Sequence, residues 1–348
     1  MRGTPLDFFV QLHVTERCNL ACRHCYQSGP VAEMSHQEVC RAITNVKTAV
    51  EGWARDYDMD ISPSLHVTGG EPLLRDDLFP ILSFARQCGF SASLMTNGTL
   101  VGAETARRIR MAEVGDVQVS LDGLESTHDR MRGRGAYRQA LEGIRHLAGE
   151  GMPASINVTV SRLNMGQAGD LVAVAAHSGA GTLAFSRLVP SGRGRSLAPQ
   201  ALTSREVAAF HQDLKRHRGH ARVTVTTRDP LASIPDVEGA IPDTEVPVAG
   251  CAAGMFGVTI TADGTVMPCR RMDLGIGNIR TQSFRDLWAD SPVLWKLRTR
   301  AEYHGRCGTC RFWPVCRGCR AVALAAARAD GSEDFLGSDP QCPYFRLS

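Results

Sequence analysis

The first 200 residues alternate between short apolar runs and longer stretches whose apolar positions recur with a helical period. Ser35 and Glu38 form a capping box ahead of the first such stretch, and residues 51–64 are expected to be a polar insertion after that helix. Further helices are predicted at 77–88, 102–112, 136–149 and 167–178. Strands are predicted at 8–15, 65–68, 91–96, 116–122, 154–161 and 182–189.

Six strand–helix repeats in succession predict an α/β fold with a parallel sheet and right-handed crossovers. We expect a partial (β/α)6 TIM-like barrel, and an open doubly wound sheet is the alternative. In both arrangements the chemistry lies at the carboxyl ends of the strands. The polar motifs of the chain fall at such ends, namely Cys18–Cys25, Gly69–Pro72, Asn97-Gly98 and Ser120–Gly123.

The chain changes character after these repeats. Residues 191–204 are expected to form a loop before a further helix at 204–218, and residues 228–248, rich in Pro, Asp and Ala, are typical of a linker. Beyond Cys251, short segments with Gly and Cys replace periodic helices, as in small domains whose metal ligands substitute for an apolar core. The predicted division is a barrel over 1–225, a linker over 226–250 and a cysteine-rich domain over 251–348.

Composition indicates an ordinary globular protein, with 43% hydrophobic and 22% charged residues. No apolar run reaches the roughly 18 residues of a membrane span, and the N-terminus has no signal-peptide pattern. We therefore expect a cytoplasmic protein without a membrane partner. The net charge of +3 does not indicate nucleic acid. The more basic window 285–320 suits an acidic ligand or, equally, a solvated face around anionic metal clusters.

Twelve cysteines are many for a cytoplasmic chain, where thiols stay reduced and serve metals or catalysis. Cys40 and Cys88 stand alone in predicted helices and are expected to be plain buried thiols. The other ten form two groups, one at 18, 22 and 25 and one at 251, 269, 307, 310, 316, 319 and 342.

The first group, Cys18-x3-Cys22-x2-Cys25, follows a predicted strand. Three thiolates can hold three corners of a [4Fe–4S] cube and leave the fourth iron open for a ligand. Zinc is the alternative, but structural zinc takes four ligands, and the nearby His24 lies inside the loop itself.

Together with Tyr26, this group resembles the signature of radical S-adenosylmethionine (SAM) enzymes. The resemblance implies that the open iron binds the methionine moiety of SAM, whose reductive cleavage gives a 5′-deoxyadenosyl radical that abstracts hydrogen. Cys18, Cys22 and Cys25 would then form the catalytic centre.

Other segments fit the same family. Gly69-Gly70-Glu71-Pro72 resembles its GGEP element, in which glycines allow close approach and the glutamate accepts from the ammonium group of SAM. The resemblance further implies that Tyr26 packs beside the adenine and that polar groups of the site meet the ribose and carboxylate. Those groups would come from Ser120 and Asp122, with Arg132 as a candidate partner of the carboxylate. Asn97 would lie in a turn that lines the site, and Arg162 and Arg187 could equally line the cavity.

The second group resembles the seven-cysteine SPASM domain, which carries two auxiliary iron–sulfur clusters. The family usually has three residues where Cys316-x2-Cys319 has two. By position, the resemblance implies an inner set of Cys251, Cys269 and Cys319 and an outer set of Cys307, Cys310, Cys316 and Cys342. Because the inner set has only three cysteines, its cluster would have an open iron, a ligand other than cysteine or a [2Fe–2S] form. Zinc is again the alternative to iron–sulfur clusters.

Auxiliary clusters favour an oxidative outcome, because the substrate radical must lose an electron. The chain resembles the pyrroloquinoline quinone and mycofactocin maturases most, while Arg270 stands where sulfatase-maturing enzymes place an aspartate. The leading hypothesis is oxidative modification (cross-link, thioether or decarboxylation) of a ribosomally made peptide. Oxidation of a non-peptide cofactor precursor such as a tetrapyrrole is the second hypothesis, and a non-catalytic iron–sulfur electron carrier is the third.

Two partners follow from these hypotheses. Because the cluster loop starts at residue 18, we expect no fused leader-binding domain and, for a peptide substrate, a separate leader-recognition protein. An external electron donor such as flavodoxin or ferredoxin is expected in either enzymatic case.

Overall fold

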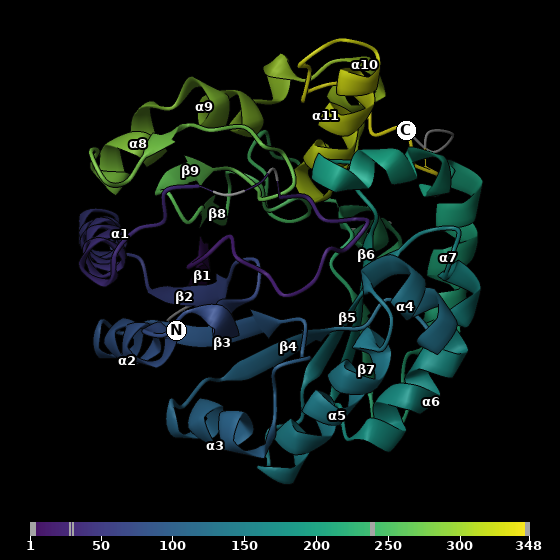
Figure 1. Ribbon diagram of the computed structural model, residues 1–348. Coiled ribbons are helices and arrows are strands. Elements are labelled where there is room, and N and C mark those ends of the chain that lie inside the picture. Colours follow the sequence, from purple (N-terminus) through teal and green to yellow (C-terminus); the bar gives the residue numbers. More distant parts are fainter. Residues whose placement is uncertain (1–4, 28, 30, 237–240, 345–348) are drawn as a thin grey trace.

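A computed structural model describes the chain except residues 1–4, 28, 30, 237–240 and 345–348 (Figure 1), so part of the predicted linker lies outside the described residues. One sheet joins ten strands in the order β10-β9-β8-β1-β2-β3-β4-β5-β6-β7. The strands are β1 (Leu6–His13), β2 (Ile61–Thr68), β3 (Ser91–Thr96), β4 (Asp116–Ser120), β5 (Ser155–Val160), β6 (Thr182–Arg187), β7 (Thr224–Thr227), β8 (Gly257–Ile260), β9 (Thr265–Met267) and β10 (Gly277–Asn278).

The strands from β1 to β7 are all parallel, which confirms the predicted α/β barrel-type sheet. β8 also runs parallel to β1, with Phe9 opposite Gly257 and Leu12 opposite Ile260, whereas β9 and β10 continue antiparallel. The cysteine-rich segment therefore extends the same sheet through β8. Strand β7 crosses the predicted boundary at residue 225.

Helices cover the outside of the curved sheet, α8 and α9 lie at the upper left of the view, and α10 and α11 lie at its top (Figure 1). Among the described residues, no helix combines the length and apolarity needed to cross a membrane. The helices are α1 (His36–Asp56), α2 (Leu78–Gln87), α3 (Ala103–Met111), α4 (Glu125–Arg132), α5 (Ala136–Gly149), α6 (Ala168–Ser178), α7 (Ser204–His217), α8 (Phe284–Asp290), α9 (Pro292–Arg298), α10 (Gly305–Gly308) and α11 (Arg320–Ala329).

Successive side chains of the strands point alternately into the apolar core and into the cavity on the other face of the sheet. Val10 and Leu12 of β1 are buried in the apolar core that includes Val39 and Ile43 of α1. The intervening Gln11 lines an internal cavity instead. Because side chains alternate across a strand, one face of the sheet builds the core while the other is free to carry polar chemistry.

Two local expectations are wrong. Residues 51–64 are not an insertion, because α1 continues to Asp56 and β2 begins at Ile61. This end of β2 is polar yet pairs with β1 from Leu6 opposite Ile61, since backbone hydrogen bonds hold it where side-chain burial is incomplete. The predicted loop at 191–204 contains a 3-10 segment over Gly192–Gln200. Helix α4 was not expected, because its Glu125–Arg132 sequence is polar and has only two buried side chains.

Candidate functional site

The loop after β1 carries the first three cysteines. Cys22 is buried, and Cys18 and Cys25 are half-buried. Burial raises the pKa of the Cys18 and Cys22 thiols. All three line one cavity of about 150 Å³ at the carboxyl ends of the strands. The three thiols thus line one shared cavity, as three ligands of one iron–sulfur cluster require.

The glycines of the GGEP element are required by the neighbouring backbone. A Cβ on Gly69 would lie 2.3 Å from the carbonyl oxygen of Thr15, and one on Gly70 would lie 2.3 Å from that of Arg17. Gly70 N donates to the Thr15 carbonyl at 2.7 Å, and Glu71 N donates to the Arg17 carbonyl at 2.8 Å. This close approach fastens the loop after β2 to the residues immediately before Cys18.

Glu71 is fully buried and does not line the cavity. Its carboxylate accepts from Thr96 Oγ1 and from Asn97 N, both at 2.8 Å, and burial raises its pKa. Asn97 in turn donates to Asn19 Oδ1 at 2.9 Å, inside the cluster loop. The structure therefore places Glu71 one layer behind the cavity, where it positions Asn97.

Asp122 also lies behind the cavity, with its side chain 0% exposed. It accepts from Arg132 Nε at 2.5 Å and from Thr159 N at 2.8 Å, and its Oδ2 lies 3.2 Å from His24 Nε2. Burial alone would raise the pKa of Asp122, but Arg132 and His24 hold it well below its usual range. Burial lowers the pKa of His24 to about 4, so His24 is neutral near pH 7.

Arg132 links this buried carboxylate to the cysteines. Its Nη1 lies 3.8 Å from Cys22 Sγ, so one positive charge faces the cluster loop. Nine of the predicted site residues line the cavity, whereas Glu71, Pro72 and Asp122 do not. The nine are Cys18, Cys22, Cys25, Tyr26, Gly69, Gly70, Asn97, Ser120 and Arg132.

A second, larger cavity of about 640 Å³ adjoins the first. It lies between the inward face of the strands and the start of the cysteine-rich segment. The two cavities share seven lining residues, which we call the waist: Gln11, Met95, Gln118, Asn157, Ser186, Arg270 and Arg271. Sequence reasoning missed these residues as site components, although polar residues at alternate strand positions were a signal that could have found Gln11, Gln118 and Asn157.

The waist is bordered by Tyr26, whose phenol pKa burial raises to about 12. The guanidinium of Arg270 lies 5.6 Å from the centre of the Tyr26 ring. Arg270 Nη1 donates to Gln11 Oε1 at 2.7 Å. The residue after Cys269 is therefore tied to both the cluster loop and the interior of the barrel.

The remaining seven cysteines separate into two groups in space. Cys251, Cys269 and Cys319 line the large cavity, while the other four line a separate small pocket. Within the described residues, no group of three or more His, Cys, Asp or Glu side chains is arranged to hold a single metal ion. A cluster needs thiols around a shared space instead, which both groups offer. The four cysteines of the small pocket are Cys307, Cys310, Cys316 and Cys342.

Donors face these thiols. Arg320 Nη2 lies 3.5 Å from Cys307 Sγ, and Gly318 N lies 3.2 Å from Cys316 Sγ. Arg271 lies beside the thiols of the inner group. N–H groups and positive charge stabilise thiolates, so both groups have surroundings that fit iron–sulfur clusters.

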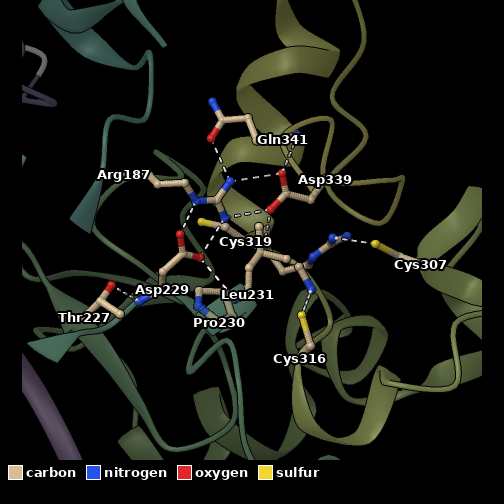
Figure 2. A network of polar contacts seen from close by, with 12 residues as sticks. Arg187, Thr227, Asp229, Pro230, Leu231, Cys307, Cys316, Cys319, Asp339 and Gln341 are labelled. Carbon is tan, nitrogen blue, oxygen red and sulfur yellow. Dashed lines mark hydrogen bonds and ion pairs between the residues drawn. The ribbon is translucent and has the colours of Figure 1, made fainter. Parts of the chain in front are cut away.

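Figure 2 shows a buried network that joins the barrel to the cysteine-rich segment. Arg187, at the end of β6, pairs with Asp229 and with Asp339, whose Oδ2 lies 2.9 Å from Arg187 Nη2. Asp339 Oδ2 also accepts from Cys319 N at 2.9 Å. Arg187 thereby reaches the backbone of an inner cysteine through one carboxylate.

Three other residues depart from expectation. Arg162 does not line either cavity; it pairs with Glu206 on the surface, because its strand has ended by that position. Cys40 and Cys88 are half-buried rather than buried, since both lie on helix surfaces that are only partly covered.

Two family models match the chain. The model described as "Radical SAM superfamily" matches residues 12–172, and the one described as "Iron-sulfur cluster-binding domain" (SPASM) matches residues 251–320. The first covers the cluster loop and the strands β2 to β5. The second covers both inner and outer cysteines except Cys342.

Similar proteins span nearly the whole chain. The AdoMet-dependent heme synthase of Methanosarcina barkeri is 32% identical over 96% of this chain and 96% of its own length. The mycofactocin maturase MftC of Mycobacterium ulcerans is 30% identical over 98% of this chain and 89% of its own. SuiB of Streptococcus suis, solved with bound S-adenosylmethionine, superposes with a TM-score of 0.75 at 16% identity, covering 97% of this chain and 77% of SuiB.

Proposed function

Because the chain belongs to the radical SAM superfamily and carries a SPASM iron–sulfur domain, we propose that it oxidatively decarboxylates a tetrapyrrole side chain. In that reaction a propionate group loses a hydrogen atom, an electron and CO₂ and becomes a vinyl group. The observation that carries the proposal is the arginine-bearing cavity between the cluster loop and the inner cysteines. The full-length similarity to heme synthases supports it.

Cys18, Cys22 and Cys25 and the two SPASM groups of cysteines would hold the clusters, which with S-adenosylmethionine would supply a 5′-deoxyadenosyl radical and electron acceptors. The residues of the chain itself hold the cluster loop in place and line the space in which the substrate would be bound and oriented. Gly69 and Gly70 brace the cluster loop, and Asn97 and Tyr26 line the space beside it. The waist connects that space with the larger cavity, which is within the size range of small-molecule sites.

A ribosomally made peptide is the second candidate substrate, with a separate leader-recognition protein as partner. It is supported by the mycofactocin maturase, whose identity over the whole chain is close to that of the heme synthases. An external donor such as flavodoxin or ferredoxin serves either substrate.

The test is an anaerobic assay of the reconstituted, reduced protein with S-adenosylmethionine. We expect 5′-deoxyadenosine from the wild type and none from the Cys18→Ala, Cys22→Ala, Cys25→Ala triple variant. Iron coproporphyrin III should increase deoxyadenosine formation and lose CO₂, as read by mass spectrometry. Stimulation by a precursor peptide encoded beside the gene, with the porphyrin inert, would replace the first candidate by the second.

A further inference from the structure

The waist carries two adjacent arginines without carboxylate partners. Within the described residues, neither Arg270 nor Arg271 forms an ion pair with an Asp or Glu side chain, although both line the two cavities. Arg270 makes one side-chain hydrogen bond, to the neutral amide of Gln11. Much of its donor capacity therefore faces the cavity.

Three other arginines of the barrel are paired with carboxylates, whereas the buried Arg317 and Arg320 of the cysteine-rich segment donate to backbone carbonyls instead. Arg132 is paired with Asp122, Arg187 with Asp229 and Asp339, and Arg75 with Asp77. Removing a cation from water without a counter-charge is costly, so partly enclosed arginines acquire anionic partners or backbone acceptors. In the part of the chain that the structure describes, Arg270 has neither a carboxylate nor a backbone carbonyl as acceptor, which leaves donors of its guanidinium free for a ligand.

The carboxylates of the larger cavity are already engaged. Asp229 is committed to Arg187, and Asp7 accepts from Ser64 Oγ at 2.8 Å. Arg228 lines the same cavity and is exposed to it. Ser64 is neutral and leaves Asp7 charged, but Arg228, Arg270 and Arg271 outnumber this one carboxylate, so the lining carries an excess of positive charge.

The two waist arginines face different anions. Arg271 lies beside the thiols of Cys251, Cys269 and Cys319 and donates to the Arg187 carbonyl at 3.3 Å. As thiolate ligands of a cluster, these cysteines would supply the counter-charge of Arg271. Arg270 points instead to Gln11 and Tyr26, between the cluster loop and the large cavity.

We propose that Arg270, assisted by Arg228, binds a carboxylate of the substrate at the waist and so fixes which part of the substrate faces the cluster loop. This inference rests on the proposed function for the identity of the substrate but not for its charge. A guanidinium offers two parallel donors to a carboxylate, which gives orientation as well as affinity. Arg270 is then a specificity-determining residue.

The first test measures binding of metal-free coproporphyrin III and of its tetramethyl ester to the reconstituted enzyme, by anaerobic ultrafiltration with chromatography of the free probe. Arg270→Gln keeps a polar chain but removes the charge, and Arg270→Lys keeps the charge. Arg162→Gln, on the surface beside Glu206, is the matched control. Iron content, measured for each variant, separates lost binding from lost clusters.

A lost charge-assisted hydrogen bond is worth about 1.5–3 kcal/mol, or roughly 10- to 150-fold in Kd. We expect Arg270→Gln to weaken binding of the acid by that factor, Arg270→Lys to retain part of the affinity and Arg162→Gln to match the wild type. The ester should bind the wild type and Arg270→Gln equally. Wild-type affinity for the acid in Arg270→Gln would overturn the proposal.

A second test does not depend on a tetrapyrrole. Phenylglyoxal modifies accessible arginines, and peptide mapping gives the modification rate of each. We expect succinate, but not its dimethyl ester, to protect Arg270 and to leave Arg162 unchanged. If the wild type binds neither porphyrin probe, the tetrapyrrole proposal fails, and protection of Arg270 still upholds the carboxylate site. Equal modification with and without succinate overturns it.

Discussion

Replacing Arg187 by methionine tests the buried network most directly. Arg187 is 5% exposed, and its partners Asp229 and Asp339 are 2% and 0% exposed. The substitution leaves the buried Asp339 without a cation and Asp229 with His211 alone, which costs about 3–5 kcal/mol. For a chain of 348 residues, an unfolding entropy of about 2.1 cal/mol/K per residue converts this to a fall in Tm of about 4–7 °C.

The assay is an anaerobic thermal scan of the reconstituted protein at one fixed scan rate, because iron–sulfur proteins unfold irreversibly. Arg162→Met is the control, since Arg162 is 40% exposed and its pair with Glu206 contributes about 1 kcal/mol or less. A fall in Tm for Arg187→Met no larger than that for Arg162→Met would refute the reasoning.

The pH dependence provides a second check. Burial alone would raise the pKa of Asp229, but Arg187 and His211 hold it well below its usual range. In the wild type this stabilisation is complete above the unfolded pKa of about 3.9 and is lost only as pH falls through the lower folded value. Without Arg187, burial raises the carboxyl pKa, and protonation relieves the penalty as pH falls. The difference in Tm should therefore narrow from pH 7 to pH 5.

Three further predictions concern the cluster sites. Gly70→Ala places a Cβ 2.3 Å from the carbonyl oxygen of Arg17, directly before the cluster loop, so the protein should lose roughly four irons of its content, whereas Gly102→Ala, with open space around it, should lose none. Glu71→Gln replaces one acceptor oxygen by an NH₂ group that faces a donor, either Thr96 Oγ1 or Asn97 N, and so disturbs the position of Asn97 beside the cavity. Binding of S-adenosylmethionine, measured by equilibrium dialysis, should weaken about tenfold, and an unchanged Kd would contradict this. Cys319→Ala should remove the signal of one cluster from the electron paramagnetic resonance spectrum, and Cys40→Ala should leave the spectrum intact.

Much of the fold could be predicted because its elements carry strong local signals. The capping box at Ser35 is present, and the helix at 136–149 has the predicted bounds. Element order could not reveal that β8 pairs with β1, because that contact joins segments distant in sequence and β8 has only four residues. Helix α4 lacked an apolar stripe and gave no periodic signal.

At the site, the spacing of the cysteines predicted which thiols lie together, but not which side chains surround and position them. Glu71 and Asp122 are identified by motif, yet the structure uses their carboxylates to hold Asn97 and Arg132. Arg270 and Arg187 depend on contacts between distant segments, with Gln11 and Asp339, which no spacing rule could supply.

The pairing of β8 with β1 bears on how the cysteine-rich segment should be studied. Excising that segment would turn β1 from an interior strand into an edge, with the backbone groups opposite Gly257 to Ile260 left unsatisfied. Exposed parallel edges invite aggregation. Truncations would then report on solubility instead of electron transfer, and a growing chain faces the same hazard until β8 is made. Point substitutions of the cysteines separate the two roles of the segment, because they remove cluster ligands while β8 still covers the edge of β1.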